Sequence, residues 1–181
     1  AKNRSLRLSQ TPSGLGGIIR CLFSLRTRTR GTLKMRLQEA SFGIIPLQQA
    51  GGEWKVLLIL HKGGRHWAFP KGRSNPGETP LESARRELKE ETGLDVDKLL
   101  QESPLSERYE FRRKGQTVTK TVQYFPALVS GRLRLQPEEI QDSKWVLLKE
   151  AMRYLTFQEA KEMCRILVQQ LIPNSTSDAV E

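Results

Sequence analysis

Three glutamates, Glu87, Glu90 and Glu91, have the type and spacing to do chemistry together. If the segment is helical, each residue advances about 100° around the axis, so the three carboxylates project from one sector of about that width. Like charges three and four residues apart repel each other, which costs free energy unless a positive group lies beside them. The three glutamates therefore require a cation.

A divalent metal ion fits this requirement better than a basic side chain, because Arg86 is expected to lie to one side of the triplet. Ligands that are all oxygen, without His or Cys, favour Mg²⁺, with Mn²⁺ as the alternative. Mg²⁺ commonly completes its shell with water and substrate phosphates. The substrate is therefore expected to carry phosphates.

The residues around the glutamates predict one helix from about residue 80 to 92. Pro80 suits a first helical turn, Leu81, Ala84 and Leu88 recur at helical spacing, and Gly93 suits the C-terminal end. The simplest alternative is a solvated acidic helix face, with no metal. That alternative gives no reason for the fixed glycines that flank the helix.

The segment from Gly72 to Leu94, GRSNPGETPLESARRELKEETGL, resembles the Nudix box at its fixed positions. The resemblance implies an α/β (α+β) fold, the Nudix α/β/α sandwich, in which a mixed β-sheet lies between helices and carries a loop-helix-loop catalytic motif. It implies metal ligands at Gly72, Glu87, Glu90 and Glu91.

Further segments resemble the asymmetrically cleaving diadenosine tetraphosphate hydrolases, over roughly residues 40–171. These are HWAFPKG at 66–72, KTVQYF at 120–125, and the six-residue spacing from Glu139 to Trp145. The resemblance implies hydrolysis of diadenosine tetraphosphate to ATP and AMP, by attack of water on phosphorus with divalent metals. Alternatives are an RNA 5' pyrophosphohydrolase, a nucleoside triphosphate or diphosphoinositol polyphosphate hydrolase, and a nucleotide-sensing module without activity.

The resemblance also implies an adenine site made of aromatic side chains, because stacking holds a purine. Tyr124 and Phe157 match stacking positions, although both also suit a core. A third position has Phe111 where the family has tyrosine, with Tyr109 two residues earlier on the same strand face, so either could serve. The expected substrate-binding residues are His66, Lys71, Tyr109, Phe111, Lys120, Tyr124 and Phe157.

An acid outside the box is also expected, because water must be activated near neutral pH. Glu138 and Glu139 are the candidates, and the resemblance selects Glu139 as a metal ligand or base, with Glu138 as a solvated neighbour. The expected catalytic residues are Arg86, Glu87, Glu90, Glu91 and Glu139.

The elements expected around the motif are strands at 40–48, 54–61 and 144–148, a hairpin of strands 108–113 and 117–128, and a closing helix at 157–171. The closing helix has Phe157, Ala160, Cys164, Leu167 and Leu171 on one face, which predicts packing against the sheet.

The net charge of +10 belongs to the N-terminal segment rather than to the domain. Residues 1–37 contain nine Lys and Arg and no acid, which leaves 21 basic and 20 acidic residues. We expect a disordered basic extension at 1–37, the catalytic domain at 38–172 and a flexible tail at 173–181. Residues 1–34 have three interpretations: a disordered arm, a transit peptide, or an extension before a start at Met35.

Composition and cysteine usage predict a soluble protein of a reducing compartment. The sequence is 37% hydrophobic and 28% charged, without a run of about eighteen apolar residues that could span a membrane. The two cysteines, Cys21 and Cys164, suggest neither a disulfide framework nor a metal site. We expect a cytoplasmic monomer, or a mitochondrial protein if 1–34 is a transit peptide, with nucleic acid bound only through the basic arm and no membrane partner.

Overall fold

The computed structural model describes residues 36–172. The interpretations of residues 1–34 and the expected tail at 173–181 lie outside the described residues. Arg36 and Leu37, which we assigned to the extension, already belong to the first strand. The domain therefore begins at least two residues before the boundary expected at residue 38.

Eight strands and three helical segments make up the described chain. In order they are β1 (Arg36–Ala50), β2 (Glu53–His61), β3 (His66–Ala68), β4 (Lys71–Gly72), α1 (Pro80–Thr92), β5 (Asp95–Leu99), β6 (Leu105–Arg113), β7 (Gln116–Ser130), β8 (Ile140–Leu147), the 3₁₀ helix η1 (Leu148–Arg153) and α2 (Gln158–Leu171). Helix α1 has the predicted bounds, and each predicted strand begins one to four residues earlier than expected. The short strands β3 and β4 and strand β5 were not predicted; β5 has the mostly polar sequence DVDKL and forms by pairing with β7.

The sheet is mixed and is built on one long parallel pair. Strands β1 and β7 run parallel from Arg36 opposite Thr117 to Leu47 opposite Leu128. Strands β2 and β4 pair antiparallel with β1, β5 and β6 pair antiparallel with β7, and β3 and β8 pair antiparallel with β2. The continuous burial of β1 from Gly43 to Leu47 is typical of a central strand covered on both faces.

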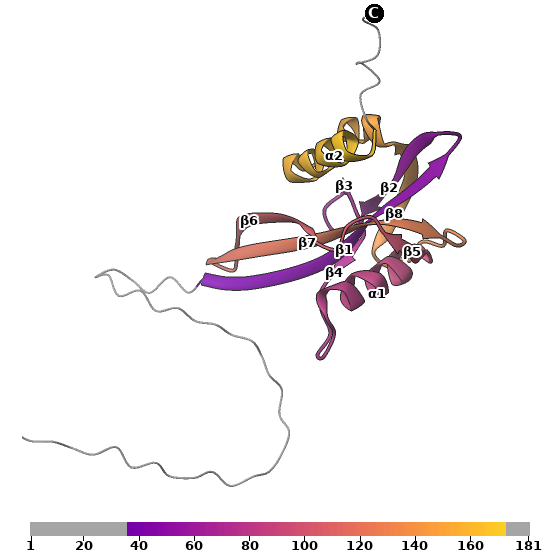
Figure 1. Ribbon diagram of the computed structural model, residues 1–181. Coiled ribbons are helices and arrows are strands. Elements are labelled where there is room, and N and C mark those ends of the chain that lie inside the picture. The colour runs from indigo at the N-terminus through magenta and orange to yellow at the C-terminus, as the bar shows by residue number, and fades with distance from the viewer. Residues whose placement is uncertain (1–35, 173–181) are drawn as a thin grey trace, which may run out of the picture.

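Helices α1 and α2 cover opposite faces of this sheet, as Figure 1 shows. Successive residues of β1 point to different layers: Ile44 belongs to the core with Leu88 of α1, and Ile45 to the core with Leu167 of α2. The predicted α/β/α sandwich is therefore confirmed, and the alternation of the strands explains its two separate cores.

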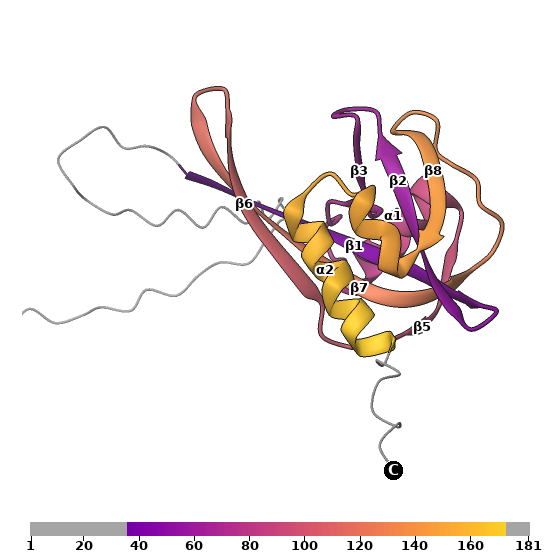
Figure 2. The ribbon, with the colours of Figure 1, turned by 90° about the horizontal axis from the view of Figure 1, so that it is seen from above.

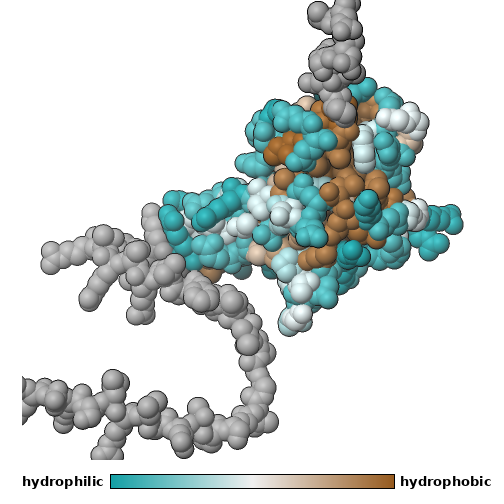
Figure 3. Space-filling view, in the orientation of Figure 1, coloured by the Kyte–Doolittle hydropathy of each residue, from teal (hydrophilic) through white to brown (hydrophobic). Residues whose placement is uncertain are grey.

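A ribbon projects from the body of the sheet. It consists of β6 with the N-terminal half of β7 and of β1 (Figures 1 and 2). Its predicted hairpin turn is confirmed, with Lys114 at φ 49° and Gly115 at φ 77°, which suit a two-residue turn between twisted strands. In Figure 3 hydrophilic residues cover the ribbon, whereas apolar residues gather on the body of the domain.

Helix α1 is fixed at both ends by its own sequence. Thr79 and Glu82 form a reciprocal capping box at the start. Gly93 ends the helix at φ 74°, a left-handed conformation that glycine adopts without strain. Between these ends, Ala84 and Leu88 are fully buried against the sheet.

Helix α2 packs as predicted through Ala160, Cys164 and Leu167, which are buried. Phe157 departs from the prediction, because it has an extended backbone before the first helical turn and its side chain is 46% exposed. Leu171 is only half-buried. Between residues 36 and 172, neither helix has the length and apolar character that crossing a membrane requires.

The close approach of β4 to β1 requires glycine at position 43. A Cβ there would lie 2.3 Å from the Pro70 carbonyl oxygen and 2.9 Å from a ring carbon of Tyr124. We predict that Gly43→Ala lowers the free energy of unfolding by about 1 to 3 kcal/mol, because these atoms must move apart. Gly63→Ala is the control, since a Cβ at Gly63 would meet nothing within 4 Å. Urea unfolding of both variants measures the difference, and equal stability would contradict this account.

Candidate active site

Arg86 ties the loop before α1 to the helix. Its Nε donates to Glu78 Oε1 at 2.7 Å, and its Nη2 donates to Glu78 Oε2 at 3.0 Å and to the Arg73 carbonyl at 2.7 Å. The guanidinium holds the pKa of Glu78 well below its usual range. This two-pronged ion pair fixes the loop against α1.

Arg86 also contacts two of the three glutamates predicted to bind metal. Its Nη1 donates to Glu87 Oε1 at 2.8 Å and to Glu90 Oε2 at 2.9 Å. Arg86 does lie to one side of the glutamates around the helix, as expected, but the inference that it cannot act in place of a metal ion is wrong. Its position is only about 40° from that of Glu90 around the helix, and the long side chain reaches both carboxylates. Arg86 thus offsets part of the repulsion that we assigned to a metal ion.

The third glutamate, Glu91, is 1% exposed. Its Oε2 accepts a hydrogen bond from the Lys71 amide at 2.9 Å, and its Oε1 lies 3.9 Å from His61 Nδ1. Burial raises the pKa of Glu91 to about 8 and also raises the pKa of Glu87. A Cβ at Gly72 would lie 1.9 Å from the Glu87 carboxylate carbon, so only glycine leaves room for that side chain.

Glu139, the predicted acid from a separate loop, lies near the box carboxylates. Its negative charge is one of the causes that raise the pKa of Glu87 and Glu91. Its carbonyl oxygen accepts a hydrogen bond from the Lys62 amide at 2.8 Å, which ties the loop to the end of β2. Both Glu139 and Glu138 are exposed. The structure therefore brings Glu139 to the electrostatic neighbourhood of the helix.

No three His, Cys, Asp or Glu side chains in the described part of the chain form a ready metal site. Glu87, Glu90 and Glu91 accept hydrogen bonds from protein donors instead. The donor set nevertheless fits a hard divalent cation, because it is all oxygen and because neighbouring carboxylates add to the burial that raises the pKa of Glu87 and Glu91. The metal-ligand roles of these three glutamates, Gly72 and Glu139 stay predictions.

A pocket of about 360 Å³ lies between the sheet and the start of α2. Its walls come from β3, β4, β6, β7 and α2. The lining residues are His66, Ala68, Lys71, Glu107, Tyr109, Lys120, Tyr124, Phe157, Glu159 and Ala160. All but one of the residues predicted to bind substrate are among them, although they are far apart in the sequence.

Phe111 is the exception. It shares a strand face with Tyr109, as predicted, and the two ring centroids are 6.1 Å apart. Tyr109 lines the pocket and Phe111 does not. Phe111 is two residues further along β6, toward the turn of the projecting ribbon, so the strand carries it away from the pocket.

Tyr124 and Phe157 lie in different surroundings. Tyr124 is 1% exposed and packs edge-to-face on Phe69, with centroids 5.4 Å apart, so it is both core and pocket wall. Phe157 is exposed at the pocket, and its ring centroid is 5.1 Å from that of His66. Phe157 is therefore free to contact a ligand without breaking a core contact.

Lys71 connects the pocket with the catalytic helix. Its side chain lines the pocket, and its amide holds Glu91. Lys120 also lines the pocket, and burial together with the charge of Lys71 lowers its pKa. Burial likewise lowers the pKa of His66. Two neighbouring ammonium groups favour an anionic ligand beside the carboxylate cluster.

Glu107 is a pocket residue that the sequence reasoning missed. It is 8% exposed, and burial raises its pKa. The alternation of β6 could have revealed it, because Glu107 is two residues before Tyr109 and shares its face.

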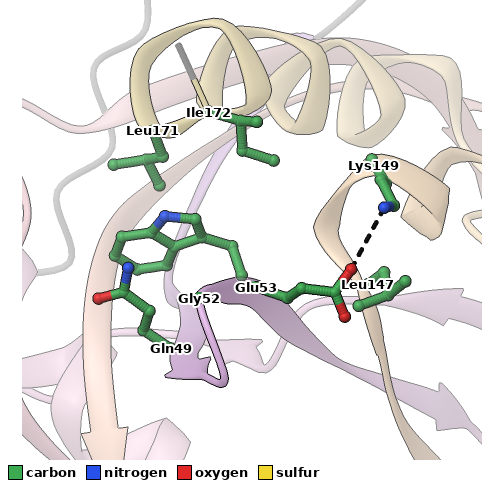
Figure 4. A pocket seen from close by; sticks show the side chains of 8 residues that line it. Gln49, Gly52, Glu53, Leu147, Lys149, Leu171 and Ile172 are labelled. Atoms are coloured by element: carbon green, nitrogen blue, oxygen red, sulfur yellow. Dashed lines mark hydrogen bonds and ion pairs between the residues drawn. The ribbon is translucent and has the colours of Figure 1, made fainter. Parts of the chain in front are cut away.

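A second pocket, of about 310 Å³, lies at the end of α2 near the β1–β2 turn. Figure 4 shows its lining, where Lys149 pairs with Glu53 at 3.3 Å beside Leu147, and Leu171 and Ile172 lie apart from this pair at the end of α2. It contains none of the predicted site residues. We therefore assign the chemistry to the pocket beside Lys71.

Residues 37–166 match the model of the NUDIX domain. The chain belongs to the NUDIX domain family. An asymmetrical bis(5'-nucleosyl)-tetraphosphatase of Rattus norvegicus is 37% identical over 109 residues, which cover 59% of this chain and 72% of that protein. An RNA pyrophosphohydrolase of Nitratiruptor sp. is 33% identical over 100 residues, 50% of this chain and 64% of that protein.

Solved structures agree on the fold. A crystal structure of a C. elegans Ap4A hydrolase binary complex superposes with a TM-score of 0.57 at 23% identity, over 74% of this chain and 97% of that chain. The NUDIX domain of Shewanella oneidensis NrtR with ADP ribose has a TM-score of 0.60 at 17% identity, over 74% and 88%. The predicted class, a Nudix hydrolase of phosphoanhydride bonds, is confirmed.

The different positions of Tyr109 and Phe111 give a testable contrast. We predict that Tyr109→Ala raises KM for a nucleotide substrate by about tenfold, because removal of a stacking ring costs about 1 to 3 kcal/mol. Phe111→Ala, which removes the neighbouring ring outside the pocket, should change KM by less than about twofold. Steady-state kinetics on the two variants provide the measurement. A larger effect at Phe111 than at Tyr109 would show that Phe111, and not Tyr109, stacks on the adenine.

Proposed function

We propose that this protein hydrolyses diadenosine tetraphosphate to ATP and AMP. The observation that carries the proposal is the position of Lys71, whose side chain lines an aromatic pocket while its amide holds Glu91 of the Nudix helix. A nucleoside in the pocket would thereby have its phosphates directed past an ammonium group toward the carboxylates.

Each part of the pocket suits one part of such a substrate. Tyr109 and Phe157 offer ring faces to a purine. Lys71 and Lys120 offer charge to the phosphates. His66 contacts the Phe157 ring and would orient it.

Glu87, Glu90 and Glu91 would hold the divalent cation, with the Gly72 carbonyl, and Mg²⁺ is the ion that we propose. When bound, the cation would neutralise phosphate charge and lower the pKa of water. Arg86 pairs with both Glu87 and Glu90, which offsets the repulsion between these two carboxylates.

Glu139 is proposed as the group that accepts the proton of the attacking water. A new bond forms between the water oxygen and phosphorus, and the bond from that phosphorus to its bridging oxygen breaks. The leaving nucleotide departs on the bridging oxygen. The loop of Glu139 is held by the Lys62 amide and brings an exposed carboxylate near the helix. The three box glutamates therefore stay available as metal ligands.

A second candidate, removal of pyrophosphate from the 5' end of RNA, is favoured by the similarity to an RNA pyrophosphohydrolase. We also propose that the diadenosine tetraphosphate hydrolase is a monomer and is cytoplasmic. The mitochondrial alternative, and nucleic-acid contact through the basic arm, depend on residues outside the described range.

Product analysis tests the proposed reaction. With diadenosine tetraphosphate and Mg²⁺ in oxygen-18 water, we expect ATP and AMP in equal amounts, with one oxygen-18 in one of them. Two ADP molecules would contradict asymmetric cleavage. Excess chelator should abolish turnover, and faster release of pyrophosphate from triphosphorylated RNA would favour the second candidate.

The acid outside the box is tested by a matched pair. We predict that Glu139→Gln lowers kcat by about a hundredfold at saturating Mg²⁺, because general base catalysis contributes about 10² or more. Glu138→Gln is the control, since it removes the neighbouring exposed charge and should leave kcat within about twofold. Small, equal effects on the two variants would remove Glu139 from the mechanism.

A further inference from the structure

His61 carries an unusual nitrogen. Its Nε2 is the one buried side-chain nitrogen or oxygen between residues 36 and 172 without a hydrogen-bond partner. The residue is 9% exposed and lies at the end of β2. A buried polar atom without a partner destabilises the folded state, and a functional role is one recognised reason for keeping such an atom.

The surroundings of His61 connect the two parts of the site. Its Nδ1 lies 3.9 Å from Glu91 Oε1, while the other oxygen of Glu91 accepts the Lys71 amide. Its ring stacks on His66, with centroids 4.9 Å apart and planes 21° apart. His66 in turn contacts Phe157 at the pocket. His61 therefore lies between a catalytic-helix carboxylate and the nucleoside pocket.

The strand that pairs with β2 is irregular beside His61. The pairing of β2 with β8 shifts register between Leu60 and His61, so His61 pairs with Ile140. The next residue, Lys62, donates its amide to the Glu139 carbonyl. The extra residue, Gln141, belongs to β8, so β2 stays regular and its alternation keeps His61 on the same face as Ile59. That face is the one covered by α1, which carries Glu91.

We propose that His61 is a positioning residue that fixes the Glu91 carboxylate, and that the protein keeps it at a cost in stability. The proposal rests on the proposed role of Glu91 in catalysis. It follows from the coincidence of an unpartnered buried nitrogen, a carboxylate contact and a stack on a pocket residue. An outer group that orients a metal-binding side chain commonly contributes tenfold or more to activity.

His61→Phe tests the proposal, because phenylalanine preserves the ring and its stack on His66 but removes both nitrogens. We expect the melting temperature to rise by about 2 °C or more, since the unpartnered nitrogen is lost. We expect kcat to fall by about tenfold, and the Mg²⁺ concentration for half-activation to rise, while KM changes by less than about twofold. A rise in stability together with a loss of turnover is not expected of a residue that only packs.

Two further variants sharpen the test. Ile59→Val alters a buried residue two positions earlier on the same face of β2 and should lower the melting temperature without changing kcat. His61→Asn keeps an amide nitrogen near the place of Nδ1 and should recover part of the kcat lost in His61→Phe.

The outcomes distinguish failure of the proposed role of His61 from failure of the proposed substrate. The assay uses whichever phosphoanhydride substrate the unmodified protein hydrolyses, so failure on diadenosine tetraphosphate alone would contradict only the proposed function. Unchanged kcat and Mg²⁺ activation in His61→Phe would overturn the positioning role. A lower melting temperature with a parallel loss of activity, or no recovery in a folded His61→Asn, would also overturn it.

Discussion

Crowded negative charge around helix α1 is the constraint on which the site depends. Arg86 offsets part of this charge, because its one guanidinium pairs with Glu78 of the preceding loop and with Glu87 and Glu90 of the helix. Glu91 is outside this network and is buried, which raises its pKa, while the Lys71 amide and the nearby Lys71 ammonium act in the opposite direction. The arrangement keeps several carboxylates close together, which is the condition for capturing a hard cation.

The sandwich architecture separates the two halves of the proposed chemistry. The carboxylates belong to α1 on one face of the sheet, and the aromatic pocket lies beside α2 on the other. The short strands β3 and β4 lie where the two halves meet, because they supply His66 and Lys71. A substrate long enough to reach both halves, such as a nucleoside polyphosphate, matches this separation better than a compact one.

Stability and function conflict at several positions near this boundary. Glu91 and Glu107 are buried carboxylates whose pKa is raised by desolvation, and His61 contains a nitrogen without a partner. An apolar residue at each of these positions would be more favourable for packing alone, because burying a polar group costs free energy. Their concentration around one pocket and one helix is the pattern expected of a functional site.

The sequence by itself determined the catalytic helix, the fold family and most of the pocket residues. Local signals suffice there: Pro80, Gly93 and the helical spacing of Leu81, Ala84 and Leu88 predict α1, and the spacing of its glutamates predicts their common face. The tertiary structure decided what depends on contacts between distant residues. Arg86 reaches Glu87 and Glu90 because its side chain is long, not because of its angle around the helix. Strand β5 forms by pairing with the edge of β7. The direction of β6 places Tyr109, and not Phe111, at the pocket. Burial likewise depends on what the rest of the chain places around a residue, so only the folded protein distinguishes Glu107 and His61 from ordinary polar side chains.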